Sequence, residues 1–237
     1  MSPQRVLVTG GSGFIAGHCI LQLLEQGYLV RTTVRSLARE PEVRTVLTDA
    51  GMTRGDALSF VVAELTSDDG WAAAVADCDY VLHVASPVNL DPHATEDEVV
   101  TPAREGALRV LKAAHDAGVK RVVLTSAFHA VGYGHPHTKV DFTEDDWSVL
   151  DGPGMNAYGR SKTLAERAAW DFIAAEGGSL ELATICPVAV MGPVMGTAIS
   201  GANHIISRIL AGRCRAIPTS GSRSSTYGTW RAHTSWP

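Results

Sequence analysis

The chain has 237 residues, of which 45% are hydrophobic and 19% are charged. This composition excludes wholesale disorder, and the length suits one large domain or one and a half. Twenty Lys and Arg against 25 Asp and Glu give a net charge of −5, so the chain lacks the basic surface of a general nucleic-acid binder. Four scattered cysteines without metal-ligand spacing, and apolar runs too short to span a membrane, indicate a cytoplasmic protein with no metal site.

Short apolar segments alternate with amphipathic ones along most of the chain. We expect strands at 5–9, 28–34, 59–63, 80–85, 121–125 and 181–186, and helices at 14–26, 41–50, 68–75, 99–117 and 156–176. This alternation predicts an α/β fold, a doubly wound parallel sheet of the Rossmann type with helices on both faces.

A glycine-rich turn, TGGSGFIAG at residues 9–17, joins the first strand to the first helix. Gly10 and Gly13 let the backbone approach a pyrophosphate, whose charge is met by amides at the helix N-terminus. A simple strand-to-helix connection is the alternative. The position directly after a strand and before an amphipathic helix favours dinucleotide binding.

The end of the second predicted strand distinguishes NAD from NADP. An NAD site places an acidic side chain there to accept from the ribose hydroxyls, whereas this chain has Arg35, with Arg39 close behind. A guanidinium suits a 2′-phosphate, so NADP is favoured over NAD. The alternative is an Arg35 that only covers the adenine face.

The pentapeptide YGRSK at residues 158–162 carries the catalytic signal. Tyr158 and Lys162 are four residues apart and therefore lie on one face of a helix. A nearby ammonium favours the phenolate and eases proton transfer between the phenol and a carbonyl or alcohol oxygen. Such a pair is common on protein surfaces, but downstream of a dinucleotide turn it predicts an oxidoreductase.

These motifs, in this order, resemble those of an extended short-chain dehydrogenase/reductase of the NAD-dependent epimerase/dehydratase superfamily. The chain is most similar to the dihydroflavonol reductase, cinnamoyl-CoA reductase and aldehyde reductase group, from Arg5 to about Pro218. The resemblance implies an NADP-binding Rossmann domain over residues 1–187 and the start of an incomplete C-terminal substrate subdomain over residues 188–218. It also implies hydride transfer between NADPH and a carbonyl or alcohol that is an aldehyde, a ketone, or flavonoid- or steroid-like.

The same resemblance assigns roles to individual residues. Tyr158 would be the proton donor and Lys162 its electrostatic partner. The implied cofactor-binding residues are Gly10, Ser12, Gly13, Phe14 and Ile15 at the pyrophosphate, Arg35 at the 2′-phosphate, Glu64 and Leu65 at the adenine, Val84, Ala85 and Ser86 under the ribose and nicotinamide, and Thr125, Tyr158, Lys162 and Pro187 near the nicotinamide.

The catalytic serine of the family is the main departure. Aligned without gaps, Thr125-Ser126-Ala127 places Ala127 at that position. Either Ser126 serves through a local shift, or Thr125, His129 or a water replaces it, or the donor is missing. We take Ser126 as the third catalytic residue. Two milder departures are Ala16 for the third motif glycine and Glu64 for an aspartate.

Two other functions stay open. A nucleotide-sugar epimerase or dehydratase would keep NAD tightly bound, and Arg35 opposes it. A non-catalytic NADP-binding redox sensor would be compatible with Ala127, whereas Tyr158 and Lys162 oppose it. His135 and His137 are interpreted as solvated loop residues, so no metal is expected. The expected partner is a small carbonyl or alcohol substrate, with no nucleic acid and no membrane, and a homodimer is allowed for.

The composition changes at residues 219–237. Nine of these 19 residues are Ser or Thr and none is acidic, which cannot build a core element. The resembling family has V-V-D-V-R-D-V-A here, and a codon string for V-V-D-V-R-D-V-A-G-A-H, read one base later, encodes residues 224–233. We therefore expect an aberrant, disordered tail after a frameshift near Pro218, which resequencing of the gene would test.

Overall fold

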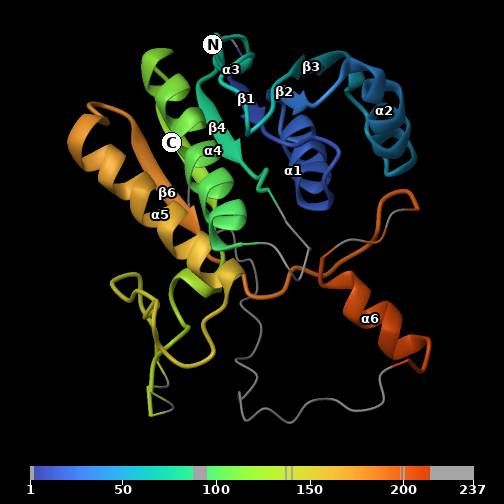
Figure 1. The fold of residues 1–237 in the computed structure, drawn as a ribbon. Coiled ribbons are helices and arrows are strands. Elements are labelled where there is room, and N and C mark those ends of the chain that lie inside the picture. Colours follow the sequence, from blue (N-terminus) through green and yellow to red (C-terminus); the bar gives the residue numbers. More distant parts are fainter. Residues whose placement is uncertain are drawn as a thin grey trace.

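A single parallel sheet organises the molecule (Figure 1). The computed structural model describes residues 3–87, 95–136, 138–139, 141–197, 199 and 201–213. The strands are β1 (Arg5–Val8), β2 (Leu29–Val34), β3 (Leu58–Val62), β4 (Tyr80–His83), β5 (Arg121–Thr125) and β6 (Glu181–Ile185). Their order is β3-β2-β1-β4-β5-β6, with parallel pairing throughout. The predicted fold class is confirmed.

Helices cover both faces of the sheet. α1 (Phe14–Glu25) and α2 (Glu40–Asp49) pack on one face, and α3 (Trp71–Val75), α4 (Glu96–Asp116) and α5 (Ala157–Glu176) pack on the other. Successive strand residues point to opposite faces. Val6 and Val8 of β1 therefore join the core under α1 and α2, and Leu7 joins the core under α3, α4 and α5.

Two helix starts differ from the sequence prediction. α4 begins at Glu96, three residues before the predicted start, because Thr95 and Glu98 form a capping box. α3 begins at Trp71, three residues after the predicted start. Gly70 before it has φ +85°, outside the right-handed helical region, so the helix cannot extend backwards through it. A Cβ there would lie 2.2 Å from the Val62 carbonyl oxygen, so only glycine fits this position.

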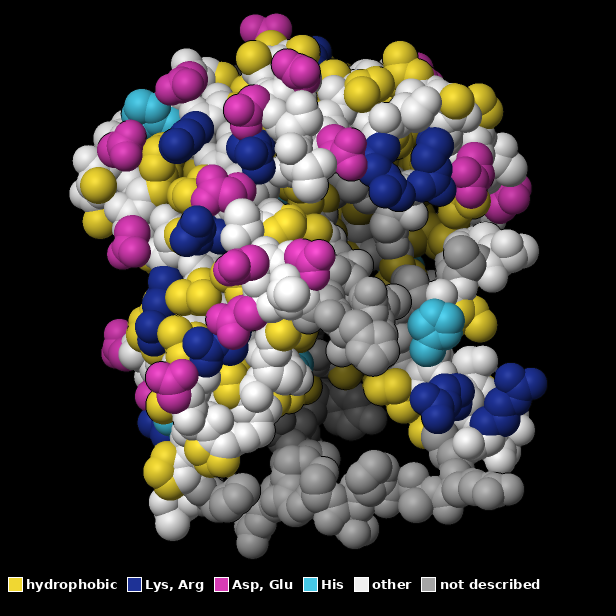
Figure 2. All heavy atoms as spheres, viewed as in Figure 1, with side chains coloured by type: hydrophobic (Ala, Val, Ile, Leu, Met, Phe, Trp, Pro, Cys, Tyr) yellow, Lys and Arg dark blue, Asp and Glu magenta, His cyan; other side chains and the backbone are white. Residues whose placement is uncertain are grey.

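The segment after β6 leaves the sheet and ends in α6 (Asn203–Leu210), which lies apart from the layered body in Figure 1. Figure 2 shows acidic and basic side chains interspersed over the body on the face in view. Within the described ranges, no helix is both long and apolar enough to cross a membrane. The predicted tail at 219–237, the end of the predicted subdomain at 188–218, and His137 lie outside the described residues.

Candidate active site

The carboxyl ends of β1 and β4 meet where the strand order reverses, which is where doubly wound sheets bind ligands. Thr9, directly after β1, holds the end of β1 against the end of β4. Its Oγ1 accepts hydrogen bonds from the backbone N–H groups of Val84 (3.0 Å) and Ala85 (2.9 Å), and it lies 2.9 Å from His83 Nδ1. The hydroxyl has two lone pairs, so its hydrogen is left for Nδ1 and the His83 proton sits on Nε2. Burial, reinforced by the charge of Lys162, lowers the pKa of His83 to about 3.

The glycine turn presses closely on its neighbours. Gly10 has φ +73°, and a Cβ there would lie 3.0 Å from Cβ of Ala85. The Gly10 N–H donates to Thr33 Oγ1 (2.9 Å), and the Gly11 N–H donates to the Thr33 carbonyl (2.9 Å). A Cβ on Gly11 would lie 2.3 Å from Thr32 Oγ1. Glycine is thus required for this turn to lie between β2 and residues 84–86.

The N-terminus of α1 opens beside this turn. Gly13 is the N-cap and supplies no side-chain cap, so the first amides of the helix lack intrahelical partners. Ser12 and Gly13 are exposed, whereas Ala16 is fully buried in the core. Free amides at a helix N-terminus are a donor set that fits a pyrophosphate. The structure therefore brings the predicted residues 10 and 12–15 together in one cradle.

The predicted adenine-side residues follow the neighbouring strands β2 and β3. Val34 and Val62, the last residues of these strands, are paired in register, so Arg35 and Glu64 lie at the same edge of the sheet. Both side chains are exposed, and Arg35 forms no hydrogen bond or ion pair with the described residues. The carbonyl of Leu65 is held by Arg109 at 2.9 Å.

The Tyr–Lys pair lies in the first turns of α5, whose N-cap Asn156 accepts from the Gly159 N–H at 2.8 Å. Lys162 Nζ donates to Ser86 Oγ (3.1 Å) and to the Thr125 carbonyl (3.5 Å), and it lies 5.9 Å from the centre of the Tyr158 ring. These contacts join α5 to the ends of β4 and β5. The structure thus brings Ser86, Thr125, Tyr158 and Lys162 together.

The electrostatics of this pair differ from the prediction. Burial lowers the pKa of Lys162 to about 8, and the carboxylate of Glu166 opposes that shift. Burial also raises the pKa of Tyr158. The net direction at Tyr158 is therefore set by burial, which outweighs the expected effect of the ammonium, since Lys162 is directed at Ser86 and Thr125.

Ser126, the predicted third catalytic residue, lies beside Lys162, Glu166 and Cys186. Its N–H donates to the Ile185 carbonyl (2.8 Å). Its Oγ is buried without a hydrogen-bond partner among the described residues and faces the thiol of Cys186. It lines a cavity of about 20 Å³ that Lys162 and Glu166 also line. Ser126 therefore lies on the Lys162 side of the site.

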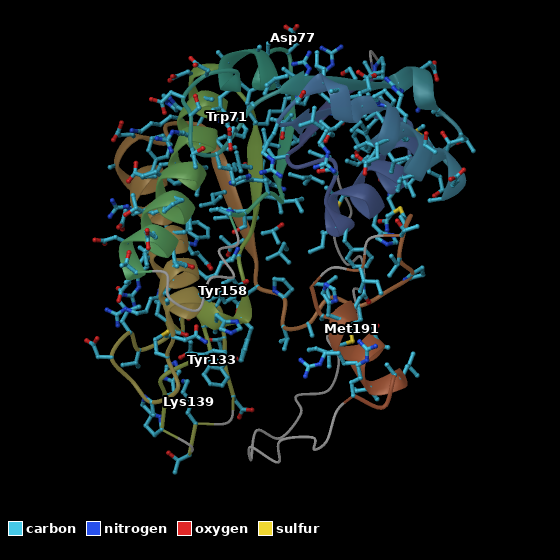
Figure 3. The ribbon with its side chains drawn as sticks, turned by 45° about the vertical axis from the view of Figure 1, so that its right-hand side comes forward. Trp71, Asp77, Tyr133, Lys139, Tyr158 and Met191 are labelled. Carbon is cyan, nitrogen blue, oxygen red and sulfur yellow. The ribbon has the colours of Figure 1, made fainter. Side chains whose placement is uncertain are left out.

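His129 is the side chain that the fold brings to Tyr158. It belongs to the short 3-10 turn Phe128–Ala130, which Ala127 opens. Its ring lies edge-on to Tyr158 with centres 5.0 Å apart and stacks on Tyr133 at 4.1 Å. Figure 3 shows both tyrosines below the carboxyl end of the sheet. The turn is tied to the predicted nicotinamide segment, since the Phe128 N–H donates to the Pro187 carbonyl at 2.9 Å.

Sequence reasoning missed Glu166 and Cys186. Cys186 Sγ donates to Glu166 Oε2 at 3.5 Å, and burial, then Glu166, raises the pKa of that thiol to about 12. Both residues also line a second cavity of about 520 Å³ with the aromatic side chains Phe128, Phe142, Trp147 and Trp170. The available signal was the spacing of Glu166, four residues after Lys162 on the same helix.

A doubly wound sheet with a glycine turn at the switch point and a Tyr–Lys pair at the same edge defines a dinucleotide-binding α/β protein. The chain belongs to the NAD dependent epimerase/dehydratase family, whose sequence profile matches residues 6–228.

Individual relatives support this assignment. The chain is 38% identical over 202 residues to dihydroflavonol 4-reductase of Arabidopsis thaliana, covering 83% of this chain and 52% of that one. It is 34% identical over 216 residues to anthocyanidin reductase of Vitis vinifera, covering 88% and 62%. The chain thus spans between half and two thirds of the length of these curated relatives.

Solved structures give the same picture. Gre2 of Candida albicans in complex with NADPH matches with a TM-score of 0.76 and 30% identity, over 88% of this chain and 66% of that one. Vestitone reductase from alfalfa (Medicago sativa) matches with a TM-score of 0.62 and 36% identity, over 77% and 56%.

Proposed function

We propose that the protein is an NADP-dependent oxidoreductase that transfers a hydride between the nicotinamide and a carbonyl or alcohol substrate. The observation that carries this proposal is the position of Tyr158 and Lys162. Lys162 is hydrogen-bonded to Ser86 and Thr125 at the edge of the sheet where the glycine turn opens. The similarity to dihydroflavonol 4-reductase, to anthocyanidin reductase and to a yeast methylglyoxal/isovaleraldehyde reductase in complex with NADPH supports a carbonyl substrate of that kind.

The cofactor is assigned from the residues that would hold it. The amides of Ser12, Phe14 and Ile15, beside Gly13, would bind the pyrophosphate, and Arg35 would take the 2′-phosphate, with Glu64 and Leu65 at the adenine. Val84, Ala85 and Ser86 would lie under the ribose and nicotinamide, and Pro187 near the ring. When bound, NADPH supplies the hydride.

The proton comes from Tyr158. A pKa raised by burial keeps the phenol protonated at neutral pH, as a proton donor to the new alcohol oxygen requires. After that transfer the phenolate is stabilised by the ammonium of Lys162. Because the pKa of Lys162 is about 8, the charged partner is present below that pH and is lost above it.

In this proposal His129 takes over the hydrogen-bond donation to the substrate that the family serine provides, and Ser126 has a different task. His129 lies beside the phenol, and burial, with the charge of Lys162, lowers its pKa. It is therefore a neutral imidazole whose N–H can donate to a substrate oxygen. Ser126 faces the cavity behind Lys162 and is assigned to the support of that lysine.

The test is NADPH titration followed by NADPH oxidation with a panel of aldehydes, ketones and dihydroflavonols. We expect NADPH binding, turnover of at least one carbonyl class, and loss of turnover in Tyr158→Phe with binding retained. Tightly retained NAD after purification would instead support an epimerase or dehydratase. NADPH binding without turnover of any substrate would support a non-catalytic sensor.

A further inference from the structure

Three functional side chains follow one another along a single face of α5. Tyr158, Lys162 and Glu166 are spaced four residues apart, so they lie one above the next on the helix. Lys162 and Glu166 are 8% and 5% exposed. Both line the cavity of about 20 Å³, a volume that holds about one water molecule.

A buried ammonium is costly unless its charge is balanced nearby. The hydrogen-bond acceptors of Lys162 are neutral, namely Ser86 Oγ and the Thr125 carbonyl. His83 on β4 is uncharged at neutral pH, because burial lowers its pKa to about 3. His129, on the turn after β5, carries no negative charge in either protonation state. None of these neighbours neutralises Lys162.

Of the acidic groups near Lys162, one carboxylate is left that can carry a negative charge at neutral pH. Cys186, after β6, is protonated at neutral pH, because burial and Glu166 raise its pKa to about 12. Tyr158 on α5 is also protonated. Among the described residues that line the cavity, Glu166 is the one acidic residue.

The carboxylate of Glu166 is also held in place. Cys186 Sγ donates to its Oε2 at 3.5 Å. The unpartnered Oγ of Ser126 faces the same cavity, so a single water there would have Ser126, Glu166 and Lys162 as polar partners. Such a water would connect the carboxylate to the ammonium without a direct ion pair.

We propose that Glu166 is a positioning residue that holds Lys162 in its charged form across the cavity that both side chains line. The proposal rests on the proposed function in one respect, namely that the charged lysine stabilises the Tyr158 phenolate. Its direct consequence is independent of catalysis: removal of the carboxylate charge lets Lys162 lose its proton at a lower pH.

The ionisation of Lys162 can be followed without cofactor or substrate. The sequence contains four lysines, Lys112, Lys120, Lys139 and Lys162, so the ¹³Cε signals of lysine-labelled protein can be assigned with Lys162→Met. We expect a titration midpoint near pH 8 for Lys162 in the parent chain. In Glu166→Gln the midpoint should fall by about one unit or more.

Matched variants separate charge from structure. Glu166→Asp retains the charge and should keep the midpoint within about half a unit of the parent, and Glu176→Gln removes an exposed carboxylate at the end of α5 and should change nothing. An unchanged midpoint in folded Glu166→Gln would overturn the proposal. If that variant does not fold, a parent midpoint below about pH 6.5 overturns it as well.

NADPH oxidation across pH links the proposal to the reaction. In Glu166→Gln the alkaline limb of kcat/KM should move to lower pH by the same amount as the NMR midpoint, with the rate on the acid side nearly retained. If the NMR midpoint of Lys162 falls but the alkaline limb of kcat/KM stays at the same pH, the catalytic role assigned to the Lys162 charge would be overturned. A chain inactive at every pH would contradict the proposed function, and the NMR midpoints would still decide the role of Glu166.

Discussion

The sheet edge around Thr9 and the segment around α6 are built in opposite ways. At the sheet edge Leu7 and Thr9 are fully buried, and the Thr9 hydroxyl uses its full hydrogen-bonding capacity on three neighbours. In α6, Ile205 is 53% exposed and Leu210 is 81% exposed. The first region is fixed by packing and hydrogen bonds, and the second leaves apolar side chains uncovered.

This contrast separates the part of the proposed enzyme that binds the cofactor and transfers the proton from the segment after β6. The residues assigned to the cofactor and to proton transfer lie on strand ends and helix starts of the layered body, and Lys162 among them is held by a hydrogen bond to Ser86. The segment after β6 contacts the body at separate points before α6: the Pro187 carbonyl accepts from the Phe128 N–H, the Pro193 carbonyl lies 3.1 Å from His18 Nε2, and Met195 packs against the core under α1 and α2. We therefore expect stability and cofactor affinity to depend on the sheet edge, and only weakly on α6.

The largest effect is expected at Tyr158. Tyr158→Phe removes the proton donor and should lower kcat for carbonyl reduction about 10³-fold, with the NADPH Kd unchanged within about twofold. Tyr133→Phe, on the far side of His129, is the control and should retain most of the rate. A Tyr158→Phe enzyme with more than a tenth of the parent kcat would remove Tyr158 from the reaction.

Thr9→Val tests the hydrogen bonds at the sheet edge. The substitution leaves two N–H groups and a buried imidazole nitrogen without their partner, so the free energy of unfolding should fall by about 3 kcal/mol. Urea denaturation measures this change. Thr45→Val on α2 is the control, because that exposed hydroxyl bonds only to Pro41 in its own helix. Equal effects of the two substitutions would contradict the special role of Thr9.

Arg35→Ser tests the choice of cofactor. Loss of a charge-assisted contact to the 2′-phosphate should weaken NADPH binding about 10- to 100-fold and leave NADH binding unchanged. Isothermal titration with both cofactors measures the ratio. Arg39→Ser, which breaks only the ion pair to Glu42, should change the ratio little. A parallel loss for both cofactors in Arg35→Ser would rule out recognition of the 2′-phosphate by that side chain.

The smallest effect is expected in α6. Leu210→Ser replaces a side chain that is already in water, so the free energy of unfolding should change by less than about 0.5 kcal/mol. Leu7→Ala, its counterpart in the core, should cost about 3 kcal/mol. Urea midpoints give both values. A Leu210→Ser loss comparable to that of Leu7→Ala would show that α6 is packed in solution, and the contrast between the two regions would fail.

The fold was predictable because its signals are local. Six strands were placed within two residues at each end, since apolar β-branched runs and glycine turns mark them directly. The starts of α3 and α4 were missed because each depends on one detail, the left-handed Gly70 and the Thr95–Glu98 capping box.

The site was predictable only in part. Gly10, Arg35, Tyr158 and Lys162 belong to short motifs, and the fold places them at one edge of the sheet. The orientation of Ser126 and the dominance of burial at Tyr158 depend on the packing of β5, η3 (Phe128–Ala130) and β6, which no local pattern encodes. Glu166 was visible as a helix spacing, but its burial was not.

Transfer of deuterium from NADPH labelled at C4 of the nicotinamide tests the central claim most directly. The full 237-residue chain would be incubated with the labelled cofactor and the carbonyl panel, and the products would be analysed by mass spectrometry. The account predicts an alcohol with one deuterium on the former carbonyl carbon, formed by the parent chain and not by Tyr158→Phe. Saturating NADPH binding with no labelled alcohol from any carbonyl in the panel would contradict it.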